Sequence, residues 1–155
     1  MINRLSANKG QLFKFLSEFH IFITMAIDYS QIPSPCFVLQ ESLLRSNLEL
    51  IDQVQKAADC KIILALKGFS MYSAFPIVKE YLSGATASSL NEIKLINDFL
   101  GCKAHTYMPA YLDVEFSEVM QRSSYITFNS LSQWERFKNR VVAFKKENPD
   151  HFLSC

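Results

Sequence analysis

Residues 61–69 read KIILALKGF, and this stretch determines how the rest of the chain is interpreted. The unbroken apolar run over 62–66 is typical of a strand buried on both faces of a parallel sheet. Because side chains alternate along a strand, the large residues Ile62, Leu64 and Leu66 share one face, while Ala65 and Lys67 lie on the other. We therefore expect the large face to pack against helices, and Lys67 to point the opposite way at the carboxyl end of the strand.

Downstream of this strand, the chain alternates between strand-like and helix-like segments. Further strands are predicted at 84–89, 103–108 and 125–129, and the last five residues, HFLSC, have the pattern of a fifth strand that is just beginning. Strands that begin about every twenty residues, with a helix after each one, indicate βα units and a parallel sheet. The sequence thus predicts an α/β fold.

Short polar signals mark where the helices begin. A helix is predicted to open at Pro76, because proline is favourable in the first turn of a helix. Two capping boxes of the form S-x-x-E/Q follow, Ser89 with Glu92 and Ser130 with Gln133. Each box predicts a helix that starts directly after a strand.

Other signals mark the helix ends. The helix after Ser89 is expected to end at Gly101, and the long helix after Ser130 is expected to end before Pro149. A helix between them is predicted over 113–122. Upstream of the first strand, 41–58 is predicted as a helix with one apolar face, formed by Leu44, Leu48, Ile51 and Ala58.

Two α/β architectures fit this pattern, the open doubly wound sheet and the closed eight-stranded barrel. A dinucleotide-binding open sheet has a glycine-rich turn after its first strand. This chain has KGFSM at 67–71 instead, and it contains no GxGxxG or GxxxxGK[ST] motif. A barrel needs about 250 residues, and the chain has 155. We therefore expect the amino-terminal half of a (β/α)8 TIM barrel over residues 27–155.

Lys67 is the main candidate for a functional residue. At the carboxyl mouth of a barrel, where barrel enzymes carry their chemistry, a partly desolvated lysine loses proton affinity and becomes an amine nucleophile. Such a lysine typically forms a Schiff base with a carbonyl group. The alternative is that Lys67 extends from the end of the strand into solvent. His105 and Trp134 are predicted to be packing residues, and Asn129 either faces the site or begins a turn.

The composition excludes several classes of function. Sixteen Lys and Arg against fifteen Asp and Glu provide no basic surface for a nucleic acid. The four cysteines, at 36, 60, 102 and 155, have neither CxxC spacing nor nearby histidines. We therefore predict no metal site, and expect reduced thiols in a cytoplasmic protein.

Residues 1–26 fit no βα unit and are predicted to be an extension. The run FHIFITMAI at 19–27 follows basic residues, loosely as in a signal peptide, but it is too short to span a bilayer. We favour Met25 as an alternative start, because MAIDYSQIPSPCF then leads directly into the ordered chain. A chain that begins at Met25 is expected to fold as well as the longer one.

Several motifs resemble the alanine-racemase-type, pyridoxal-phosphate-dependent decarboxylases, and in particular the carboxynorspermidine decarboxylase family. The motifs are SPCFVL (34–39), ALKGF (65–69), GATASSLNE (84–92) and FNSLSQWE (128–135), in the order that the family has. The resemblance implies that Lys67 forms the Schiff base with pyridoxal 5'-phosphate. It also implies a cofactor contact at Thr86, where related decarboxylases carry an acid.

The same resemblance implies decarboxylation of carboxynorspermidine or carboxyspermidine in polyamine biosynthesis, by a homodimer. The family's phosphate cradle, the acid that pairs with the pyridine nitrogen and the carboxy-terminal β domain are not found in residues 1–155. We therefore expect a truncated chain that does not turn over alone. Two alternatives stay open: a pyridoxal-phosphate-binding module similar to the homeostasis proteins, and an inactive fragment.

Overall fold

The computed structural model describes residues 28–155, which form two units, 28–38 and Leu39–Cys155. The predicted extension over 1–26 and the alternative start at Met25 lie outside the described residues. In the first unit, the 3-10 helix η1 (Tyr29–Gln31) is capped by Asp28, whose carboxylate accepts a hydrogen bond from the Ser30 N–H at 3.0 Å. The second unit contains the sheet that positions the candidate site.

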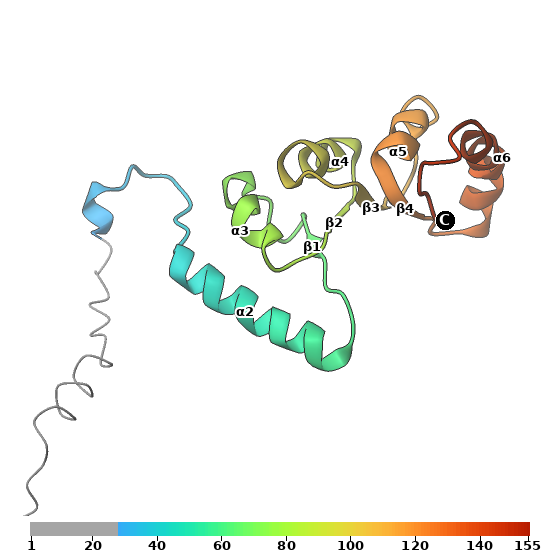
Figure 1. Cartoon of the computed structure of the whole chain (residues 1–155). Helices are drawn as coiled ribbons and strands as arrows, with labels where there is room; N and C mark the ends of the chain where they lie inside the picture. Colours follow the sequence, from blue (N-terminus) through green and yellow to red (C-terminus); the bar gives the residue numbers. More distant parts are fainter. Residues whose placement is uncertain (1–27) are drawn as a thin grey trace, which may run out of the picture. The chain divides into compact units, whose positions relative to one another are not determined.

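Four parallel strands form this sheet, and they lie side by side in sequence order (Figure 1). They are β1 (Leu64–Ala65), β2 (Ala85–Ala87), β3 (Ala104–Tyr107) and β4 (Ser123–Thr127). All three pairings are parallel, which confirms the predicted α/β fold. The order runs without a reversal, as in a barrel and unlike a doubly wound sheet, which has a point where the strand order switches.

The end of the chain adds a further strand position beside β4. Ser154 pairs in parallel with Tyr125. The Ile126 N–H donates to the Ser154 carbonyl at 2.9 Å, and the Ser154 N–H donates to the Ser124 carbonyl at 3.0 Å. These bonds confirm the prediction that HFLSC begins a fifth strand.

Helices follow the strands as predicted. They are α2 (Glu41–Ala58), α3 (Phe75–Lys79) after the 3-10 turn η2 (Tyr72–Ala74), α4 (Leu90–Leu95) continued by the π-helical turn η3 (Ile96–Leu100), α5 (Phe116–Arg122) and α6 (Leu131–Glu147). Helices α3 to α6 lie along one side of the sheet (Figure 1). Among residues 28–155, no helix is both long enough and apolar enough to cross a membrane.

Both predicted capping boxes are present, with one shared difference. Ser89 Oγ accepts a hydrogen bond from the Glu92 N–H at 3.2 Å, as a capping box requires. In a standard capping box the Glu92 carboxylate would accept a hydrogen bond from the N–H of the N-cap residue, Ser89. Here it accepts instead from the N–H of the preceding residue, Ser88, at 2.5 Å. At the start of α6, Gln133 accepts in the same way from the Asn129 N–H at 3.1 Å. Each box therefore fixes the turn from strand to helix as well as the helix start.

The prediction for the start of α5 is wrong by three residues. The helix begins at Phe116 rather than at 113. Asp113 instead forms ion pairs with Arg136 and Arg140 of α6, and its carbonyl accepts from Arg140 at 3.1 Å. These contacts hold the segment before α5 against α6, so that the residues from 113 to 115 remain outside the helix.

The apolar face of α2 is shorter than predicted. Leu44, Leu48 and Ile51 pack with a cluster that contains Val78 and Leu82, whereas Ala58 is exposed. Ala58 is the last residue of the helix, and the chain turns directly after it at Asp59, which has a φ of 48°. The last turn of α2 therefore extends past the elements that cover its middle.

The main core lies between the sheet and the helices on one of its faces. Its fully buried large side chains come from the helices and from β4: Phe75, Ile93, Ile96, Phe116, Ile126 and Phe137. The large face of the first strand packs on this side, as predicted, since Leu66 is 2% exposed. On the opposite face Ala65, Tyr107 and Tyr125 are exposed. We call this second side the open face.

Candidate functional site

Lys67 lies in a turn at the carboxyl end of β1. The N–H groups of Gly68 and Phe69 both donate to the Ala65 carbonyl, at 2.9 and 3.1 Å, so the strand ends before Lys67. The Lys67 side chain is exposed. The prediction of a strand through residue 67 is therefore wrong, and the exposure of Lys67 agrees with the alternative that its side chain extends into solvent rather than with a partly desolvated ammonium group. The reason is that the turn carries Lys67 out of the sheet, on a side that no described element covers.

Thr86 lies next to this turn on the neighbouring strand. It is in register with Ala65, and its carbonyl accepts from the Leu66 N–H at 3.3 Å. Because of this register, the half-buried Thr86 side chain shares the open face with Ala65. The structure thus brings Lys67 and Thr86 to adjacent positions at one edge of the sheet. Within the described chain, no hydrogen bond joins their side chains.

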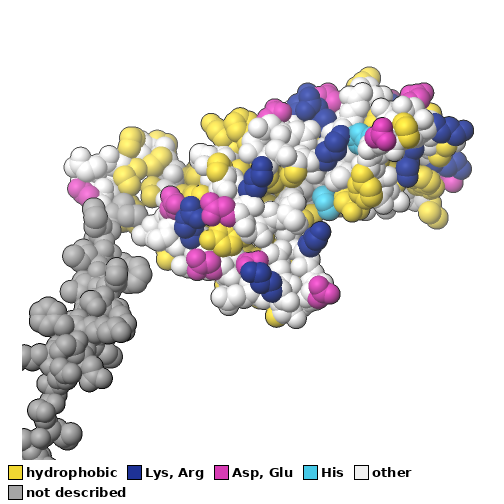
Figure 2. Space-filling model, viewed as in Figure 1, with side chains coloured by type: hydrophobic (Ala, Val, Ile, Leu, Met, Phe, Trp, Pro, Cys, Tyr) yellow, Lys and Arg dark blue, Asp and Glu magenta, His cyan; other side chains and the backbone are white. Residues whose placement is uncertain are grey.

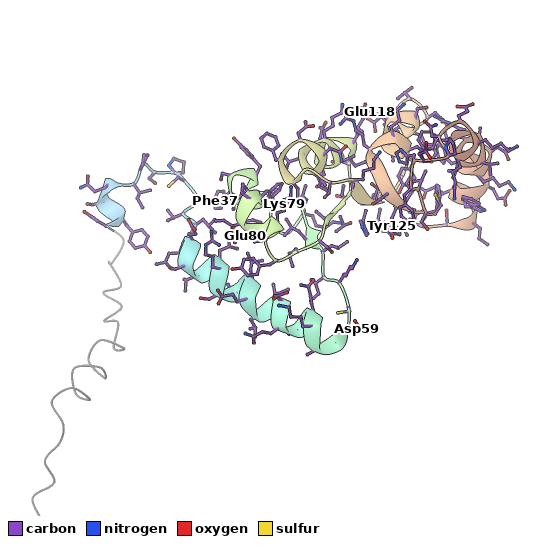
Figure 3. All side chains as sticks on the ribbon, viewed as in Figure 1. Phe37, Asp59, Lys79, Glu80, Glu118 and Tyr125 are labelled. Atoms are coloured by element: carbon purple, nitrogen blue, oxygen red, sulfur yellow. The ribbon has the colours of Figure 1, made fainter. Side chains whose placement is uncertain are left out.

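A row of residues continues from Thr86 across the open face. Thr86 is in register with His105, and His105 with Tyr125. The two rings stack with their centroids 4.3 Å apart. Figure 3 shows Tyr125 on the side of the sheet away from α5, the helix that carries Glu118. The open face therefore presents aromatic side chains beside the candidate site.

His105 fills space within this row rather than reaching toward Lys67. A Cβ atom built on Gly84 would lie 3.9 Å from His105 Nε2 and 3.7 Å from Ile63, so the imidazole lies over the glycine. Burial lowers the pKa of His105 below its ordinary value. The prediction that His105 is a packing residue agrees with these contacts.

The other two residues that the sequence singled out hold the neighbouring loops. Asn129 donates from its amide nitrogen to the Pro109 carbonyl at 2.6 Å, which ties the turn after β4 to the loop after β3. Trp134 is half-buried and packs edge-on against Phe128, with centroids 5.3 Å apart. Trp134 is thus a packing residue, as predicted.

A pocket that the sequence did not reveal lies along the same edge of the sheet. It has a volume of about 180 Å³ and lies between the turn after β2 and the loop after β3. It is lined by Ser88, Ser89, Leu90, Asn91, Met108, Ala110, Leu112 and Glu115. No motif marks Glu115 in the sequence, because half of the pocket lining, Ser88 to Asn91, comes from the preceding βα unit.

The residues at this edge fit the attachment of a carbonyl cofactor. Lys67 offers an exposed primary amine, the group that condenses with an aldehyde, and Thr86 offers a hydroxyl group beside it. The described glycines, Gly68, Gly84 and Gly101, each stand alone. Within the described chain they therefore build no glycine-rich nest for a phosphate.

Comparison with known proteins identifies the relatives of this chain. No family model matches it. A carboxyaminopropylagmatine decarboxylase of Synechocystis is 41% identical over 141 residues, which cover 88% of this chain and 36% of that protein. A carboxynorspermidine/carboxyspermidine decarboxylase of Campylobacter jejuni is 40% identical over 113 residues, which cover 73% of this chain and 30% of that protein.

A solved structure is similar as well. Carboxynorspermidine decarboxylase of Campylobacter jejuni, crystallised with norspermidine, matches with a TM-score of 0.69 and 40% identity, over 72% of this chain and 30% of that one. Over most of its length the chain is similar to the carboxynorspermidine decarboxylases. It spans about a third of the length of the curated relatives it matches. The similarity to this structure confirms the predicted fold class, part of a parallel α/β barrel.

Proposed function

We propose that this chain provides the cofactor-attaching part of a pyridoxal-phosphate-dependent decarboxylase of polyamine biosynthesis. The observation that carries the proposal is the 41% identity to a decarboxylase over 88% of the chain, a share so large that it includes Lys67 wherever the alignment begins. The relatives' names broaden the substrate class beyond carboxynorspermidine and carboxyspermidine, because one of them acts on carboxyaminopropylagmatine. All three compounds are amines that carry several positive charges and a carboxyl group. We infer a carboxylated polyamine as the substrate.

In this proposal Lys67 attaches the cofactor through its primary amine. Its exposure at the carboxyl edge makes the amine accessible both to the cofactor and to the substrate amine that replaces it. The Thr86 hydroxyl lies on the adjacent strand and would orient the bound group by hydrogen bonding. When bound, pyridoxal phosphate supplies the electron sink for the charge that loss of CO2 leaves behind. Once the substrate amine has taken its place, the free Lys67 amine would carry, at its Nζ atom, the proton that is passed between the lysine and the substrate.

The proposal extends to the setting in which the protein works. We infer a homodimer in the cytoplasm, as the family resemblance implies. The alternative of a binding module without a reaction receives no support from the relatives, which are named as decarboxylases.

Labelling of Lys67 tests the proposal directly. The chain is incubated with pyridoxal phosphate, the imine is reduced with borohydride, and the modified lysines are located by peptide mass spectrometry. We expect Lys67 to be labelled well before Lys61 and Lys79, which are also exposed and serve as internal controls. The Lys67→Arg variant keeps the charge and should lose this label. Equal labelling of all three lysines contradicts the assignment.

A further inference from the structure

We propose that the pocket lined by Glu115 is a subsite for an ammonium group of the polyamine substrate. The inference rests on the proposed function and adds the residues that hold the end of the substrate remote from the reacting carbon. We call this recess the Glu115 pocket; its eight lining residues are those given above.

The lining of the Glu115 pocket matches the chemistry of a polyamine. A polyamine alternates short methylene segments with ammonium groups, so it needs apolar walls beside a negative charge. The apolar part of the pocket is formed by Leu90, Met108, Ala110 and Leu112. The polar part is formed by Ser88, Ser89, Asn91 and Glu115. None of the lining residues is a lysine or an arginine, so the only formal charge in the lining is negative.

Glu115 differs from the other carboxylates near the pocket in its partners. Glu118 forms ion pairs with Arg122 at 2.8 Å and with Lys94 at 3.4 Å. The Glu92 carboxylate accepts from the Ser88 N–H and, at 2.9 Å, from the Ser88 hydroxyl. Among the described residues, the half-buried Glu115 side chain has neither an ion pair nor a hydrogen bond. A partly buried carboxylate that lacks a partner gains from binding an ammonium group.

The position of the pocket relative to Lys67 suits a linear substrate. Lys67 follows β1, whereas Ser88 and Met108 directly follow β2 and β3. Neighbouring strands are about 4.8 Å apart, so the end of β3 lies about 10 Å from the end of β1. An extended polyamine chain covers a distance of this order. Its reacting end can therefore reach Lys67 while its far ammonium group lies in the Glu115 pocket.

Binding of norspermidine to the chain tests this inference. Norspermidine is titrated into the isotope-labelled protein, and backbone amide shifts are followed by NMR in the wild type and two variants. We expect saturable shifts at Asn91 and Glu115, and a dissociation constant about tenfold higher in Glu115→Gln, because a charge-assisted hydrogen bond is lost. Glu118→Gln removes the same charge from a carboxylate that is already paired, and should change the constant less than about twofold.

The outcomes separate this inference from the proposed function. Equal weakening in both variants, or an absence of shifts at Asn91 and Glu115 in the wild type, overturns the subsite. Labelling of Lys67 by pyridoxal phosphate does not involve Glu115. If Lys67 is labelled and Glu115→Gln binds norspermidine normally, only the subsite is wrong. If Lys67 is not labelled, the proposed function is wrong, whatever the norspermidine titration shows.

Discussion

Gly101 shows how a single residue ends a helix in this fold. It follows the last turn of η3 with a φ of 72°, in the left-handed region, and its N–H donates to the Ile96 carbonyl at 3.0 Å. Glycine is favoured at this position because a Cβ atom is strained there. The sequence predicted this helix end correctly from the glycine alone.

Replacement of Gly101 measures the strain. We expect Gly101→Ala to lower the free energy of unfolding by about 1 kcal/mol, because the Cβ atom of alanine is strained in the left-handed conformation. The new Cβ would lie 3.3 Å from Lys79 Nζ, the end of a flexible side chain, so backbone strain dominates. Gly68→Ala is the control, since its Cβ would meet only the Ala65 carbonyl at an ordinary 3.5 Å. Chemical denaturation that shows equal losses in the two variants would contradict this account.

Protonation of His105, on the open face, makes the free energy of unfolding depend on pH. Its folded pKa is lowered by burial from 6.5, so the unfolded chain binds more protons between the two values. The free energy of unfolding should therefore fall as the pH drops from 6.5 through the folded pKa of His105. Above pH 6.5 the imidazole is neutral in both states, and His105 causes no pH dependence. His105→Gln should flatten the dependence of the unfolding free energy on pH just below pH 6.5. An unchanged slope would mean that other groups cause it.

At the scale of elements, the strand-to-helix turns carry much of the local order. Ser130 Oγ accepts from the Gln133 N–H at 3.2 Å at the start of α6, and the Gln133 side chain bonds back to Asn129. Asn129 and Gln133 both donate to the Pro109 carbonyl, at 2.6 and 3.3 Å. One helix start therefore also holds the loop that leads toward the Glu115 pocket.

Loss of this cap should destabilise α6. We expect Ser130→Ala to lower the free energy of unfolding by about 1 kcal/mol, the usual contribution of an N-cap serine. Ser83→Ala is the matched control, because Ser83 is exposed and no side-chain hydrogen bond involves it within the described chain. Thermal melts of both variants measure the difference. A cap that contributes nothing would leave the two melting temperatures equal.

For the molecule as a whole, the open face is a sheet surface of the second unit that carries exposed aromatic side chains. Tyr107, Tyr125 and Phe152 are 45%, 39% and 63% exposed, and the rings of Tyr125 and Phe152 pack edge-on. Figure 2 shows hydrophobic side chains lying open on the surface between charged groups. A sheet face of this kind, with backbone groups at its edges, favours association.

The chain is accordingly expected to self-associate in solution. Tyr125→Lys combined with Phe152→Lys should shift the mass measured by light scattering after size exclusion toward that of a monomer, because the charges oppose contact between open faces. Val142→Lys, on the exposed side of α6, is the control and should leave the mass unchanged. A monomeric wild-type chain would show that the open face does not drive association.

The sequence by itself determined the order and type of the elements and pointed to Lys67 as the main candidate residue. Alternating apolar patterns, capping boxes and the terminal glycine act over a few residues, so the parallel α/β fold and most helix boundaries follow from local chemistry. Lys67 could be proposed because its motif lies in one continuous stretch. The sequence left open whether its side chain is desolvated or exposed, since that depends on a turn closed by the Ala65 carbonyl.

Only the tertiary structure decided which distant groups meet. Asp113 was expected to open a helix, but two arginines more than twenty residues away hold it outside one. The Glu115 pocket exists because the turn after β2 and the loop after β3 come together at one edge of a parallel sheet. No local pattern records whether a carboxylate has found a partner. That property depends on the whole set of neighbours, which packing brings together.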